Sequence, residues 1–232
     1  MTIGLVIPTF NEEQTLPHTL ETATQLQIDE IVVVDGGSQD RTLQVAQSFF
    51  ERPLLYHTHT LVSTPGRATQ MNMGAMVTQT DILVFLHADT QLPINARTAI
   101  EQAMADTRIH WGRFDVQFET DRGWAWVISR MMNFRSRWSR MATGDQAIFI
   151  RRSIFQQLGG FANIPIMEDL ELSRRLKKAG EMAALRDKVT TSFRRWEQQG
   201  PLRTILLMWT LRFLYWVGLA PRALQRFYGM VR

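Results

Sequence analysis

Polar residues that could bind a ligand follow three apolar runs in the first ninety residues of the sequence. These residues are Thr9 and Asn11 after the first run, Asp35 at the end of the second, and His87 and Asp89 after the third. A carboxylate can accept hydrogen bonds from ribose hydroxyl groups, whereas a carboxylate beside a diphosphate needs a divalent cation between them. A single aspartate at a strand end is usually a turn former, so the prediction of a ligand site depends on Asp35 and Asp89 lying together.

The three apolar runs predict strands that are buried on both faces, because they lack polar alternation. They span residues 3–7, 30–35 and 81–86. Between them the sequence predicts a helix capped by Asn11, helices at residues 39–50 and 66–77, and a weaker strand at residues 54–57. Such alternation is typical of a parallel sheet with helices on both faces. The polar residues at the carboxyl ends of the strands would then share one edge of the sheet, where ligands bind in this class of fold.

The pattern changes after the first ninety residues. Residues 111–118 alternate and predict a half-solvated strand at a sheet edge, with Arg113 facing solvent. A helix at residues 123–140 is expected to bury a stripe formed by Trp124, Ile128, Met131, Met132 and Trp138. Further elements are expected as a short strand at residues 146–150 and a charged helix at residues 168–179 that ends at Gly180.

The C-terminal segment is both basic and apolar. Seven arginines and one acid, Glu197, lie between Arg194 and Arg232, while the other 193 residues carry a net charge of −2. The uncharged stretches on either side of Arg212 are eight and nine residues long, far short of the roughly 20 that a spanning helix needs. We expect an amphipathic helical tail that either packs on the domain or lies on the inner face of the cell membrane. Nucleic acid is not an expected partner.

Features that the sequence lacks exclude several classes of protein. There is no cysteine, which excludes a disulfide scaffold, a thiolate zinc site and a cysteine nucleophile. Neither the GxGxxG dinucleotide fingerprint nor the GxxxxGK[ST] phosphate loop is present. The first residues lack the basic stretch of a signal peptide, so we expect the chain to start with a strand and to be cytoplasmic.

Several segments, taken in order, resemble motifs of glycosyltransferase family 2. Residues 6–13, 33–42 and 85–90 resemble its nucleotide-binding half, and residues 144–146, 158–161 and 167–172 resemble its acceptor-side segments. Residues 194–196 are similar to the arginine–tryptophan motif of processive members. The resemblance implies the GT-A fold, an α/β fold with a mostly parallel, Rossmann-like sheet flanked by helices. It also implies a domain over residues 1–197, with a nucleotide-sugar-binding half at 1–90 and an acceptor half at 91–197, and a basic helical tail at 198–232.

The same resemblance implies roles for individual residues. Pro8, Thr9 and Glu12 would line the nucleoside pocket, Asp35 would hold the base or ribose, and Arg67 would reach the phosphates. Asp169 would be the catalytic base with Glu168 beside it, and the substrate-binding turn would be formed by Gly144, Asp145 and Gln146.

The resemblance also implies a metal ion, Mn²⁺ or Mg²⁺, on a triplet that ends at Asp89. Two residues depart from the family pattern. His87 stands where the first acid of the triplet is usual, so imidazole and one carboxylate would share the metal. Gly36 replaces an acid of the second motif, which leaves Asp35 as its only carboxylate.

The resemblance therefore implies an inverting, metal-dependent glycosyltransferase. Its donor would be a nucleotide-sugar, with a UDP-sugar favoured, and its acceptor a hydroxyl group on a lipid-like or small amphiphilic molecule. The sequence resembles small bacterial members that are linked to carotenoid glycosylation or to arsenosugar formation. Two alternatives stay open from the residues alone: a nucleotidyltransferase on a related α/β sheet, and a catalytically silent scaffold that docks on membranes.

Overall fold

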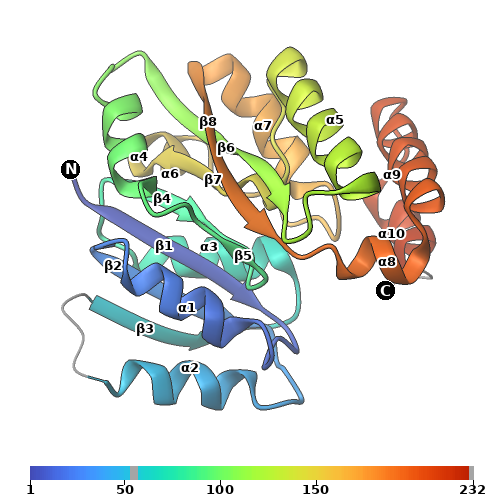
Figure 1. The fold of residues 1–232 in the computed structure, drawn as a ribbon. Coiled ribbons are helices and arrows are strands. Elements are labelled where there is room, and N and C mark those ends of the chain that lie inside the picture. Colours follow the sequence, from blue (N-terminus) through green and yellow to red (C-terminus); the bar gives the residue numbers. More distant parts are fainter. Residues whose placement is uncertain (53–56, 230–232) are drawn as a thin grey trace.

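One eight-stranded sheet runs through the computed structural model, which describes residues 1–52 and 57–229 (Figure 1). Its strand order is β3-β2-β1-β4-β7-β6-β8-β5. The strands are β1 (Ile3–Thr9), β2 (Glu30–Asp35), β3 (His57–Val62), β4 (Ile82–Phe85), β5 (Thr90–Gln91), β6 (Ile109–Phe118), β7 (Ile148–Arg151) and β8 (Glu181–Thr191). The first four strands pair in parallel, as do β6 and β8, whereas β7 is antiparallel to both of its neighbours. The predicted mostly parallel α/β sheet is confirmed.

Helices cover both faces of the sheet because the central strands alternate their side chains between two cores. Ile3, Leu5 and Ile7 pack in one core with side chains of α1, α2 and α4, while Val6 packs in the other with side chains of α3, α6 and α7. These helices are α1 (Leu16–Thr24), α2 (Thr42–Phe50), α3 (Arg67–Val77), α4 (Ala96–Met104), α6 (Arg152–Gln157) and α7 (Glu168–Ala179). The last of them has the predicted bounds.

The loop after β1 differs from the prediction. No helix begins at Asn11, which adopts a positive φ of 55° and accepts a hydrogen bond from the backbone N–H of Gln39 through its side chain. Helix α1 starts only at Leu16, so Glu12 and Glu13 remain in the loop. Most of the strand expected at residues 54–57 lies outside the described residues, and β3 begins at His57.

The prediction of a sheet edge at Arg113 is wrong. Strand β6 lies between β7 and β8, and Trp111, Arg113 and Phe114 are completely buried in it. Pairing with β8 makes β6 an internal strand, and the sequence of β8 contains Arg186, Asp187 and Lys188 and gives no apolar strand pattern.

Helix α5 (Gly123–Ser139) forms where a helix is expected, but much of the predicted buried stripe is exposed. Ile128 is buried, whereas Trp124, Met131 and Trp138 have exposed fractions of 46%, 41% and 83%. The helix therefore presents large apolar side chains to solvent.

The C-terminal tail forms three helices that pack against the domain (Figure 1). They are α8 (Arg194–Gln199), α9 (Pro201–Trp216) and α10 (Pro221–Gly229). Leu211 of α9 and Leu224 of α10 are buried in one cluster with Met167 and Leu170. Over the described ranges, no helix combines the length and apolar character needed to cross a membrane. The expected domain boundary after residue 197 falls inside α8 and stays a prediction.

Candidate active site

The carboxyl ends of β1 and β2 meet at Thr9 and Asp35, which are partners in the parallel register. Thr9 Oγ1 donates a hydrogen bond to Asp35 Oδ1 at 3.2 Å, and both residues are almost completely buried. Asp35 also accepts hydrogen bonds from the backbone N–H groups of Gly37 and Ser38 and from the Ser38 hydroxyl. Because each carboxylate oxygen of Asp35 already has two donors, Asp35 fixes the turn after β2, and a ligand hydroxyl must share or replace one of them. Pro8 is buried beside Thr9 in β1.

Gln70 of α3 holds these two strand ends together. Its side-chain Nε2 donates hydrogen bonds to the carbonyl oxygens of Thr9 and Val34, at 2.7 and 2.8 Å. A Cβ atom at Gly36 would lie 3.0 Å from Cδ of Gln70, so the space that a larger side chain needs is already filled. This contact explains why glycine stands at position 36. Sequence reasoning missed Gln70, because a polar residue within an amphipathic helix carries no signal of its own.

Two carboxylates, those of Glu12 and Asp89, approach each other where β1 and β4 end. Burial raises the pKa of Glu12, and the charge of Asp89 raises it further, against a hydrogen bond from Thr15 and the charge of Arg194. Arg194 Nη2 lies 3.9 Å from Glu12 Oε2, so the start of α8 contributes a cation to this edge. Asp89 Oδ1 accepts a hydrogen bond of 3.3 Å from the hydroxyl of Thr90.

His87 pairs with the turn that was predicted to bind substrate. Its Nδ1 lies 3.2 Å from Asp145 Oδ1, and its Nε2 is buried with no hydrogen-bond partner among the described residues. Partial burial raises the pKa of Asp145, but the hydrogen bond and charge of His87 and the charges of Arg67 and Arg195 lower it to about 2. A Cβ atom at Gly144 would lie 2.3 Å from His87 Nε2, so the ring packs directly on the turn.

A metal ion at this edge would depend mainly on Asp89. Within residues 1–52 and 57–229, no group of three histidine or acidic side chains is arranged to hold a cation. Magnesium is commonly bound by one or two carboxylates together with substrate phosphates, and the single carboxylate of Asp89 fits that arrangement. Both ring nitrogens of His87 face protein atoms, which favours Asp89 as the principal ligand. His87 as a metal ligand stays a prediction.

Asp169 and Glu168 lie at the start of α7, where the helix dipole favours acids. Asp169 Oδ2 accepts a hydrogen bond from the backbone N–H of Gly144 at 3.0 Å. Glu168 is buried, and burial together with the charge of Asp169 raises its pKa, against the charge of Arg67, whose Nη1 lies 3.9 Å from Glu168 Oε1. Met167, immediately before this pair, has a positive φ of 67° that is costly for a side chain of its size. The helix start is therefore held in a specific, strained geometry.

The turn that carries Asp145 is a short 3₁₀ segment, η1 (Gly144–Gln146), with a capping box. The backbone N–H of Thr143 donates to Gln146 Oε1, and Gln146 Nε2 donates to the carbonyl oxygen of Phe114 in β6, at 3.2 and 3.5 Å. These contacts anchor the turn to the centre of the sheet.

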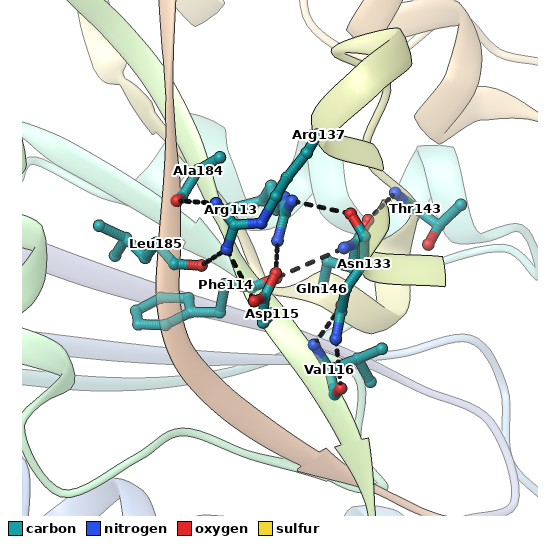
Figure 2. A network of polar contacts seen from close by, with 10 residues as sticks. All are labelled: Arg113, Phe114, Asp115, Val116, Asn133, Arg137, Thr143, Gln146, Ala184 and Leu185. Atoms are coloured by element: carbon teal, nitrogen blue, oxygen red, sulfur yellow. Dashed lines mark hydrogen bonds and ion pairs between the residues drawn. The ribbon is translucent and has the colours of Figure 1, made fainter. Parts of the chain in front are cut away.

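A buried polar network stabilises β6 at this point (Figure 2). Asp115 forms ion pairs with Arg113 and with Arg137 of α5, and Arg137 also donates to two carbonyl oxygens of β8. Asn133 of α5 exchanges hydrogen bonds with the backbone of Val116, at 2.8 and 2.9 Å. The network ties α5 to the sheet, so Arg113 is a structural residue.

Comparison with known proteins supplies a family context. A family model described as "Glycosyl transferase family 2" matches residues 5–162. A PGL/p-HBAD biosynthesis glycosyltransferase of Mycobacterium bovis is 33% identical over 174 residues, which cover 68% of this chain and 62% of the relative. A 4,4'-diaponeurosporenoate glycosyltransferase of Staphylococcus haemolyticus is 32% identical over 92 residues, which cover 39% of this chain and 24% of the relative. The chain thus spans less than two thirds of the length of these relatives, which include a carotenoid glycosyltransferase, as the resemblance implied.

Solved structures share the fold at low sequence identity. TarS 1–349 of S. aureus in complex with UDP has a TM-score of 0.69 at 16% identity, and the match covers 83% of this chain and 60% of that one. The mannosyltransferase PcManGT from Pyrobaculum calidifontis, in complex with GDP-Man and Mn²⁺, has a TM-score of 0.64 at 19% identity, with 90% and 64% covered. The GT-A type of fold is therefore confirmed.

Proposed function

The chain belongs to glycosyltransferase family 2, and on this basis we propose that it moves a sugar from a nucleotide-sugar to a hydroxyl group of a lipid-like or small amphiphilic acceptor. The observation that carries the proposal is the linkage of two groups of residues. Asp169 is hydrogen-bonded to Gly144, and the adjacent Asp145 is paired with His87 at the end of β4. A carboxylate suited to act as a base is thereby tied to the strand edge at which nucleotides bind in open α/β sheets. Family membership decides against a nucleotidyltransferase.

In the proposed mechanism, Asp169 removes the proton from the acceptor hydroxyl as its oxygen attacks the anomeric carbon of the donor. The bond between that carbon and the diphosphate oxygen breaks in the same step, so the configuration at the carbon inverts. The hydrogen bond from Gly144 to Asp169 Oδ2 orients the carboxylate for this role. A Mn²⁺ or Mg²⁺ ion held by Asp89 would neutralise charge on the departing nucleoside diphosphate.

The donor would lie along the strand ends, with Pro8, Thr9, Glu12 and Asp35 around the nucleoside and Arg67 at the phosphates. Two observations support this placement. Arg67 begins α3 and lies beside Glu168, close enough for its charge to lower the pKa of Asp145. Structures of the same fold contain UDP or GDP-Man, which agrees with a nucleoside diphosphate donor, a UDP-sugar being our first choice.

The tail is proposed to dock on the surface of an anionic membrane. Five exposed apolar side chains of α9 recur every three or four residues and so form one continuous face of the helix: Leu202, Leu206, Trp209, Phe213 and Trp216. The opposite face packs on the domain through Leu211. Exposed arginines occur at position 203 of α9 and at positions 222 and 226 of α10, and their charge complements anionic headgroups.

Nucleotide-dependent stabilisation tests the proposed donor site. The melting temperature is measured with UDP, GDP, CDP and dTDP, each with Mn²⁺, with Mg²⁺ and with EDTA. A ligand at about 100 times its dissociation constant adds roughly 2.7 kcal/mol to the free energy of unfolding. The proposal predicts a metal-dependent rise with one nucleotide above the others. No rise with any nucleotide would overturn it and favour a catalytically silent scaffold.

A further inference from the structure

Leu211 of helix α9 packs against the start of α7, next to the proposed base. Leu211 has an exposed fraction of 1% and packs in a cluster with Met167 and Leu170, the two residues that bracket Glu168 and Asp169. Met141, which follows the C-terminal end of α5, packs against the same cluster. The tail and the end of α5 therefore both contact the segment that holds the proposed base.

Two arginines lie close enough to interact electrostatically with Asp169: Arg212 from α9 and Arg135 from the last two turns of α5. Arg212 Nε and Arg135 Nη2 are shielded from solvent and have no hydrogen-bond partner among the described residues. In the described part of the chain, neither arginine forms an ion pair, unlike Arg113, Arg137 and Arg175, each of which pairs with a carboxylate.

The two guanidinium groups act on each other and on the acids of the site. Burial and the charge of Arg212 lower the pKa of Arg135 to about 9, against the opposite influence of Asp169 and Asp145. Burial lowers the pKa of Arg212, again against Asp169 and Asp145. Leaving buried charge without a hydrogen-bonded partner is unfavourable, and an anion bound between the two arginines would satisfy both. Guanidinium groups match phosphate and carboxylate groups in shape and can bind them through paired hydrogen bonds.

We propose that Arg135 and Arg212 form a binding site for an anionic group of the acceptor, a phosphate or a carboxylate, beside Asp169. The inference rests on the proposed function, because it assigns Asp169 as the base that deprotonates that acceptor. The donor diphosphate is assigned to the strand ends with Asp89, whereas these arginines come from α5 and α9. Arg212 lies in sequence between Trp209 and Phe213 of the exposed apolar face, so an acceptor with an anionic head and an apolar tail suits this helix.

The test measures binding of a defined amphiphile, octyl phosphate below its micellar concentration, by titration calorimetry on the full chain. The neutral octyl glucoside serves as the matched ligand. We expect Arg135→Gln and Arg212→Gln each to weaken octyl phosphate binding at least about tenfold, because each removes a charge-assisted hydrogen bond. Octyl glucoside binding is expected to stay unchanged. Arg130→Gln is the matched control, since it removes an exposed arginine from α5, the helix that carries Arg135.

Two results would contradict the anion site. Equal losses of octyl phosphate affinity in Arg130→Gln and Arg135→Gln would show a general attraction of the anion to positive charge. If the Arg135 and Arg212 variants lose affinity for UDP with Mn²⁺ but still bind octyl phosphate, the two arginines would be assigned to the donor diphosphate.

The melting temperature of each variant shows whether it folds. If a glutamine variant does not fold, Arg135→Lys or Arg212→Lys replaces it, because lysine keeps the positive charge. Because neither arginine is paired, we expect no fall in melting temperature for the glutamine variants, and a large fall would show that the arginines are structural. If the wild-type chain binds UDP but the Arg135 and Arg212 variants bind octyl phosphate as tightly as the wild-type chain does, only this inference is overturned. Failure of every nucleotide to bind the wild-type chain overturns the proposed function itself.

Discussion

The carboxylate of Asp145 lies 3.2 Å from Nδ1 of His87 and connects two parts of the site that are far apart in the sequence. His87 follows β4, on the nucleotide side, whereas Asp145 lies in the turn whose Gly144 N–H group binds Asp169. A displacement of either side chain is therefore expected to affect both the metal edge and the proposed base. The pair also explains why a histidine at position 87 is compatible with the fold.

The contact between His87 and Asp145 predicts a specific pH dependence of stability. The pKa of Asp145 is lowered from 3.8 to about 2 in the folded chain. The lowered pKa of Asp145 therefore contributes stability that is fully present above pH 3.8 and is lost as the pH falls towards 2. Asp145→Asn should lower the melting temperature at pH 6 and make progressively less difference between pH 4 and pH 2. Because the side chain is 47% exposed, the effect should not exceed about 1 kcal/mol. Asp121→Asn, at an exposed site, is the control, and a difference independent of pH would contradict the assignment.

Variants at the metal edge separate the roles of Asp89 and His87. Asp89→Asn should abolish the part of UDP stabilisation that depends on Mn²⁺, because it removes the carboxylate assigned to the cation. His87→Gln should keep that dependence while lowering the melting temperature, since His87 is paired with Asp145. Melting curves with UDP and Mn²⁺, and with UDP and EDTA, provide the comparison. Loss of metal dependence in His87→Gln would instead make the imidazole a ligand.

The contact between Gly36 and Gln70 predicts strong coupling between these two positions. Gly36→Ala places a Cβ atom 3.0 Å from Gln70 Cδ, and the displaced amide loses its bonds to the strand ends. The expected cost is about 1–3 kcal/mol, typical of overpacking in a core. In a Gln70→Ala background the same change should cost much less. A double-mutant cycle by denaturant unfolding measures the coupling. Additive effects of the two substitutions would contradict the proposed role of Gln70 in holding the two strand ends together.

The exposed apolar face of α9 predicts binding to anionic vesicles. Replacing Trp209 and Trp216 with serine should remove most of the vesicle-bound fraction in a flotation assay, because both side chains lie on that face. Met76→Ser is the matched control, an exposed apolar side chain on α3. High salt should weaken binding of the wild-type chain, since the Debye length falls to about 3 Å at 1 M. Unchanged flotation of the double variant would contradict membrane docking by α9.

The first half of the sheet could be predicted because its strands are buried on both faces. The runs that became β1, β2 and β4 have no polar alternation, and their chain order already places Asp35 and Asp89 at one edge. The bounds of α7 were equally predictable, its start from the acids of the first turn and its end from Gly180.

The second half could not be predicted in the same way because its contacts are non-local. Strand β7 pairs with β4, and β8 pairs with β6, although charged residues in β8 hide its strand pattern in the sequence. Arg113 was therefore expected on solvent and is buried in an ion pair. His87 and Asp145 meet for the same reason: His87 follows β4, Asp145 precedes β7, and these two strands pair although they are far apart in the sequence.

Transfer by the Asp169→Asn variant tests the central claim most directly. Release of nucleoside diphosphate is measured from a panel of nucleotide-sugars, with a total lipid extract as the acceptor source, alongside the affinity for the nucleotide. Asp169→Asn should retain that affinity and lose about 10²-fold or more in the rate, since it removes only the general base. Equal rates in the wild-type chain and the variant would contradict the assignment of Asp169, and no release from any donor would contradict the proposed reaction.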